Sequence, residues 1–106
     1  MSRENERQPI AMKGHMKTSR GRRQDVTITD LSPTGCKIES LYLALTVGEV
    51  IFLRPEGIEG RSCTVAWCTE QSAGLRFDQP FHPAVFENLC RLHPGLRPDG
   101  KPEEGP

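Results

Sequence analysis

A short group of polar residues in this sequence has the types and spacing to bind a polar ligand. Asp30, Ser32 and Gly35 lie within TDLSPTGCKIES, residues 29–40. Alternation along an extended segment puts Asp30 and Ser32 on one face, opposite Leu31. There the carboxylate can accept two N–H donors, as a guanine edge offers, and the hydroxyl can donate to a phosphate oxygen. Gly35 can adopt a positive φ or allow close approach to the backbone. These residues are also ordinary turn formers, so the turn alone favours a structural role.

Two further groups of arginines bear on the same chemistry. Arg3 and Arg7 are four residues apart near the N-terminus. Each guanidinium can bind a phosphate or the O6/N7 edge of guanine with two hydrogen bonds, and can stack on a base. Arg20, Arg22 and Arg23 form the other group, most simply a solvated turn and alternatively a supporting anion contact or docking surface.

The residues around these groups alternate between apolar and polar side chains, which predicts short strands. Six are expected, over residues 10–17, 24–30, 36–39, 50–54, 61–69 and around 75–77. Within 50–54 the first four residues form a continuous apolar run, which predicts a buried strand. In 61–69, Cys63, Val65 and Trp67 alternate onto one face, so Trp67 is expected in the core or lining the barrel.

A single helix is expected after the last strand. Pro80 ends the sheet, and Pro83 suits the first turn of a helix because its missing N–H needs no partner there. His82 and His93 are expected as capping or surface residues at its two ends. Apolar residues follow at helical spacing: Val85, Phe86, Leu89, Cys90 and Leu92. Frequent short strands followed by one helix predict an all-β, six-stranded antiparallel barrel whose helix covers one open end.

Length and composition indicate one small domain. The chain has 106 residues, of which 35% are hydrophobic, and this is a thin supply for a core. We expect a flexible arginine arm over residues 1–8, the barrel with its helix over 9–94, and a disordered tail over 95–106.

The charge distribution favours a local anion site. The formal net charge is zero, but residues 1–23 contain seven Lys and Arg against two Glu. A neutral chain with a basic front predicts no general nucleic-acid affinity. No apolar run approaches a membrane span, and MSRENERQPI lacks the apolar core of a signal peptide, so we expect a cytoplasmic protein without membrane insertion.

Enzymatic and metal chemistry are not expected. Ser32 does not lie in a Gly-x-Ser-x-Gly elbow, and the sequence has no Walker motif. The four cysteines, Cys36, Cys63, Cys68 and Cys90, lack paired metal-ligand spacing. We therefore expect small buried hydrophobic side chains at these positions, with no catalytic and no metal-binding residue.

Arg3-x3-Arg7 followed by Asp30-x-Ser32-x-x-Gly35 resembles the signature of PilZ domains, bacterial receptors for cyclic di-GMP. The resemblance covers roughly residues 3–93. Three other segments are similar to that family: Val47-Gly48-Glu49, Trp67, and Ala73-Gly74-Leu75-Arg76-Phe77.

The resemblance implies a split β-barrel with a C-terminal helix, and cyclic di-GMP as ligand without another cofactor. It implies that Arg3 and Arg7 clamp guanine and phosphate, while Asp30, Ser32 and Gly35 contribute from the barrel surface. The ligand would order the arm over the barrel and change the binding of an effector protein. One departure is that the arginine motif begins two residues from the start of the sequence.

Two other functions stay open. Some members of the resembled family are interaction modules that keep the barrel and do not bind nucleotide. A small barrel for single-stranded nucleic acid would need aromatic platforms along a basic groove, and the sequence offers few aromatic residues outside the expected core.

Overall fold

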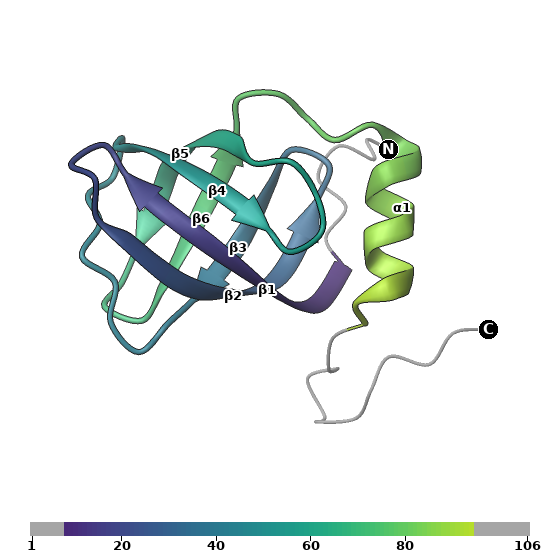
Figure 1. Ribbon diagram of the computed structural model, residues 1–106, viewed down its shortest axis with the longest axis horizontal. Helices are drawn as coiled ribbons and strands as arrows, with labels where there is room; N and C mark the ends of the chain where they lie inside the picture. Colours follow the sequence, from purple (N-terminus) through teal and green to yellow (C-terminus); the bar gives the residue numbers. More distant parts are fainter. Residues whose placement is uncertain (1–7, 95–106) are drawn as a thin grey trace.

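The computed structural model, which describes residues 8–94, is a closed barrel of six antiparallel strands followed by one helix (Figure 1). The predicted all-β architecture with a C-terminal helix is therefore confirmed. The arm arginines Arg3 and Arg7, and the tail 95–106, lie outside the described residues. The elements are β1 (Gln8–Thr18), β2 (Arg23–Ser32), β3 (Gly35–Glu39), β4 (Val50–Pro55), β5 (Arg61–Cys68), β6 (Ser72–Phe77) and α1 (Pro83–Leu92).

The strands follow the order β1-β2-β3-β6-β5-β4 around the barrel, and β4 pairs with β1 to close it. The segment 40–49 connects β3 to β4 at the end of the barrel opposite α1 (Figure 1). Its Leu43 is buried within the core. The helix lies at the other end, where the N–H of Ala11 in β1 donates to the carbonyl of His93 at 3.0 Å. Within residues 8–94, no helix is long and apolar enough to cross a membrane.

The core fills the barrel interior because each strand alternates between an inner and an outer face. In β1 the inner positions from Ile10 to Thr18 are all buried and the outer ones are all exposed. The helix adds Phe86 and Leu89 to this core. All four cysteines are thiols. Cys36 and Cys63 are buried as expected, whereas Cys68 and Cys90 are only partly buried. Burial raises the pKa of the Cys63 thiol to about 12.

The helix ends agree with the sequence. Pro83 is its first residue, and the His82 Nδ1 accepts the N–H of Ala84 at 3.1 Å. At the other end the N–H of His93 donates to the carbonyl of Leu89 at 3.0 Å. Both histidines are therefore capping residues, as expected.

The strand predicted at 50–54 is present, but the prediction that it is buried was wrong for its three outward residues. Ile51 and Leu53 point into the barrel, whereas Val50 and Phe52 are 52% and 47% exposed. A barrel wall has only one inner face, so alternate residues of β4 must face outward. The apolar run does not reveal which residues these are.

The expected core position of Trp67 was also wrong. Cys63 and Val65 are buried, but the pairing of β5 with β6 shifts register between Val65 and Trp67. Such a bulge redirects the side chains that follow it. Trp67 is 39% exposed as a result, and its indole packs over Gly74 of β6.

Candidate functional site

The β2–β3 hairpin brings Asp30, Ser32 and Gly35 together. Asp30 lies in β2 as predicted, but β2 extends further to Ser32 and β3 already begins at Gly35. Ser32 pairs with Gly35 across the hairpin, which leaves only Pro33 and Thr34 as the turn. The motif is therefore a tight corner at the end of two paired strands.

Ser32 holds this corner closed. Its side chain is 6% exposed, and its Oγ accepts the N–H groups of Gly35 at 3.1 Å and Thr34 at 3.3 Å. The same hydroxyl donates to the carbonyl of Gly35 at 3.3 Å. The structural role that the sequence favoured for this turn is thus present in the fold.

Gly35 is needed for close packing between strands, and its φ angle is not positive. Positive φ values occur elsewhere, at Gly21, Gly48 and Gly57. A Cβ added at Gly35 would overlap the carbonyl of Leu75 on β6. The glycine therefore lets β3 approach β6 directly beside the turn.

Asp30 lies at the point where β1 enters the barrel. It is half-buried on β2, next to Pro9 of β1 on one side and Lys37 of β3 on the other. A register shift between Ile28 and Asp30 adds a residue to β2 here, and the following Leu31 is buried. Gln8, the first residue of β1, pairs with Leu31. The start of β1 therefore lies beside the motif.

A hollow of about 200 Å³ adjoins the corner, between the motif and strands β5 and β6. Exposed Arg76 of β6 lies directly across from Gly35, and half-exposed Trp67 lies over Gly74. The hollow is lined by Ser32, Thr34, Gly35, Cys36, Ala66, Trp67, Gly74, Leu75 and Arg76. It thus combines an aromatic face and a guanidinium with Ser32 and Gly35 of the motif, whereas Asp30 is not among its lining residues.

Arg76 and the outward position of Trp67 are absent from the site residues predicted from the sequence. Both lie in segments that the sequence analysis had noted, but the alternation of β5 wrongly indicated that Trp67 points inward. Only the bulge in β5 and the pairing of Gly35 with Arg76 bring these two side chains beside the motif.

The structure does not bring the second arginine group to this site. Arg20 and Arg22 lie in the turn after β1, and Arg23 is the first residue of β2. Ser32 is the last residue of that strand, so the rise per residue separates Arg23 from it by roughly 30 Å. These arginines lie at the opposite end of the barrel.

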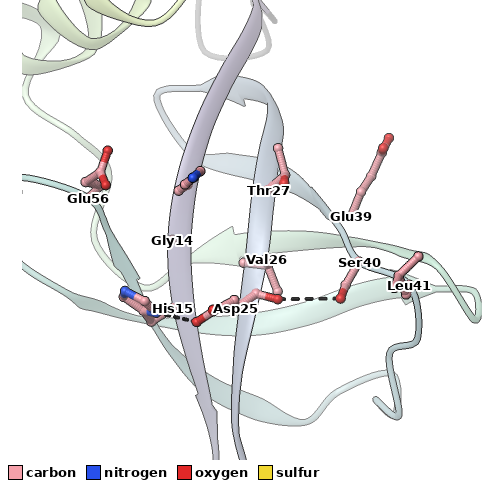
Figure 2. Close-up of a pocket in the computed structure, with 10 residues that line it drawn as sticks. Gly14, His15, Asp25, Val26, Thr27, Glu39, Ser40, Leu41 and Glu56 are labelled. Atoms are coloured by element: carbon pink, nitrogen blue, oxygen red, sulfur yellow. Dashed lines mark hydrogen bonds and ion pairs between the residues drawn. The ribbon is translucent and has the colours of Figure 1, made fainter.

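Another hollow, of about 380 Å³, lies on the outer side of β1 and β2 (Figure 2). In it the Nδ1 of His15 and the Oδ1 of Asp25 lie 2.7 Å apart and form an exposed hydrogen bond. Lys13, Glu39 and Glu56 also line it, and this mixture of charges does not favour an anion. Among residues 8–94 no three His, Cys, Asp or Glu side chains are grouped to hold a metal ion.

Comparison with known proteins places the fold. No family model matches the chain, and no curated protein matches it. Among solved structures, the PilZ domain of CeSA from a cellulose-synthesizing bacterium is similar with a TM-score of 0.60 at 14% identity, over 83% of this chain and 94% of that one. YcgR from Escherichia coli, in complex with c-di-GMP, has a TM-score of 0.58 at 15% identity, over 82% of this chain and 42% of that one. At such identities the likeness concerns the fold, and the fold of this chain is PilZ-like.

Proposed function

We propose that this protein is a bacterial, cytoplasmic receptor for cyclic di-GMP that transmits its signal to a partner protein. The observation that carries the proposal is the register between β1 and β2. Gln8 pairs with Leu31 and Pro9 with Asp30, so the chain enters β1 beside the motif. Arg7 directly precedes Gln8 in the sequence. At the level of fold, the likeness to YcgR in complex with c-di-GMP supports the same function.

Each residue of the site has a proposed role. Arg3 and Arg7 bind phosphate and the O6/N7 edge of guanine. Asp30 accepts the N1 and N2 donors of guanine, because a carboxylate offers two acceptor oxygens. Ser32 and Gly35 act through the shape of the corner, against which the ligand lies.

Two residues of the hollow extend the site. Trp67 presents a half-exposed indole on which a base can stack, and base–aromatic stacking contributes about 1–3 kcal/mol. Arg76 adds a guanidinium across from Gly35 that can bind a phosphate oxygen. The proposed mechanism is binding and ordering of a segment, and it assigns no catalytic residue.

The contribution of the arm to cyclic di-GMP affinity depends on two opposing free-energy terms. Charge-assisted hydrogen bonds contribute roughly 1.5–3 kcal/mol each, so four from two arginines give about 6–12 kcal/mol. Fixing a flexible segment costs about 1–2 kcal/mol per residue. Ordering five or more residues therefore offsets most of this gain, so the two arginines should add only a small net part of the binding free energy.

Calorimetric titration of the full chain with cyclic di-GMP tests the proposal. Wild type should bind, and Arg7→Ala or Asp30→Ala should each lower the affinity about tenfold or more, since each removes a charge-assisted contact. The double variant Arg20→Ala/Arg22→Ala removes two arginines at the other end of the barrel and should bind as wild type does. No binding by wild type, or unchanged affinity of Arg7→Ala, would refute the proposal.

The alternative is an interaction module with a PilZ-like fold that does not bind nucleotide. The hydrogen bonds of Ser32 within the turn favour it, because they give the motif a structural role without any ligand. The same titration distinguishes the two functions.

A further inference from the structure

The outer face of β4 carries two apolar side chains beside Arg54, although no described element packs over it. Val50 and Phe52 are about half exposed, and they alternate with the buried Ile51 and Leu53. A strand that is apolar on both faces is typical of a sheet covered on both sides. In neighbouring β1 the outer positions include Lys13, His15 and Lys17, as expected for a face in water. In contrast to β1, the outer face of β4 is therefore suited to contact with another molecule.

Cations surround Phe52 on this face. Lys17 of β1 lies directly across from Phe52, and it is paired on its other side with Arg23 of β2. Arg54 is the next outward residue of β4. With His15 and Met16 these residues line a hollow of about 480 Å³.

Acidic residues within the described part of the chain do not pair with these cations. Within residues 8–94, Lys17, Arg23 and Arg54 form no ion pair. The adjacent acid on β2, Asp25, pairs instead with His15. The hollow itself has no acidic residue in its lining.

The ring of Phe52 lies against Gly60, which directly precedes β5. A Cβ added at Gly60 would overlap this ring, so the glycine leaves room for it. About half of Phe52 remains exposed and can contact a partner.

We propose that this β4 face, defined as Lys17, Arg23, Val50, Phe52 and Arg54, binds an acidic segment of a protein partner. An apolar side chain of the segment covers Val50 and Phe52, while carboxylates pair with the cations. The inference takes from the proposed function only the existence of a partner protein. The face is built on β1, β2 and β4, and it does not include the motif corner.

The chemistry of the face favours a protein segment over other polyanions. Single-stranded nucleic acid stacks successive bases on several aromatic rings, and this face has one ring beside an aliphatic Val50. Membrane surfaces are bound by amphipathic helices whose apolar side enters the lipid, whereas Val50 and Phe52 lie on a strand of the barrel wall.

Selection from a random peptide display library against the full chain tests the inference. Enriched peptides should carry at least two Asp or Glu around an apolar residue. Lys17→Glu and Arg54→Glu should each weaken the binding of such a peptide about tenfold, and Phe52→Thr should weaken it similarly. Lys13→Glu makes the same charge change on β1 outside this hollow and should leave binding unchanged. Amide NMR shifts caused by the peptide should fall on β1 and β4 and spare the β2–β3 corner.

Several results would overturn the inference. They are the absence of enriched peptides, enrichment without acidic residues, and binding that survives both charge reversals. Binding of oligo-dT or of phosphatidylglycerol vesicles that Phe52→Thr abolishes would assign the face to nucleic acid or lipid instead. Titrating the Arg54→Glu variant with cyclic di-GMP separates this inference from the proposed function, because nucleotide binding should persist when peptide binding is lost. A wild-type chain that binds peptide and not nucleotide would refute the proposed function alone.

Discussion

Ser32 shows how one residue of the motif can serve the fold and the site together. Its hydroxyl accepts two backbone N–H groups and donates to one carbonyl within the same corner, although it is almost fully buried. Leaving a buried donor without its acceptor costs about 1–3 kcal/mol. The fold therefore favours serine at position 32 even where no ligand binds. The presence of Ser32 is compatible both with a nucleotide receptor and with an interaction module.

Replacing Ser32 by Ala should lower the free energy of unfolding by about 1–3 kcal/mol, because two N–H groups lose their acceptor. Urea unfolding followed by circular dichroism measures this. Ser19→Ala, in the exposed turn after β1, is the matched control and should change stability little. A Ser32→Ala protein as stable as wild type would show that the hydroxyl does not hold the corner.

Two glycines set the geometry of neighbouring strands around the site. Gly35 lets the backbone of β3 approach Leu75 of β6, and Gly74 of β6 provides the surface on which Trp67 lies. The group that an added side chain would meet differs between Gly35 and Gly74. At Gly35 it is a backbone carbonyl within a paired strand, whereas at Gly74 it is an indole that can turn outward.

Gly35→Ala and Gly74→Ala should therefore have different effects. Gly35→Ala should destabilise the fold by about 1–3 kcal/mol, as overpacking against fixed atoms does. Gly74→Ala should cost less stability but displace the indole of Trp67, the single tryptophan, and shift its fluorescence. Thermal unfolding and emission spectra of the two variants compare these effects. Equal loss of stability, with unchanged emission from Gly74→Ala, would contradict this assignment.

The strands also show where sequence patterns work and where they fail. Sequence patterns predicted all six strands to within a few residues, β4 from an apolar run and the others from alternation, because inner and outer faces of a barrel wall differ in polarity. The prediction of burial failed for β4, where both faces carry apolar residues, and for Trp67, which follows a bulge. A bulge depends on how a strand pairs with its neighbour, and that information lies outside the strand itself.

In the whole molecule, β1 runs from the motif to β4. Its first residues pair with the motif at Asp30 and Leu31, and its last residues pair with β4 at Ile51 and Phe52. A ligand held by Arg3 and Arg7 would order the segment before β1. We therefore expect the ligand to reduce the motion of the segment before β1 without rearranging the strands of the barrel.

NMR relaxation on the full chain tests this consequence. Without ligand, amides of residues 2–7 should have order parameters below about 0.6, and saturating cyclic di-GMP should raise them toward the rigid-backbone range near 0.85. Amides on the outer side of β4 should keep their order parameters. An arm that is equally mobile with and without saturating nucleotide would exclude the ordering mechanism even if binding itself occurs.

The sequence by itself determined the strands, the helix with its histidine caps, and the spacing of the motif, because periodicity and turn chemistry act between residues close in the chain. The tertiary structure decided which of these parts meet. Barrel closure and strand register placed the start of β1 beside Asp30, moved Arg23 to the opposite end, and turned Trp67 outward next to Arg76. Pairing between distant strands produces these positions, and no short stretch of residues encodes it.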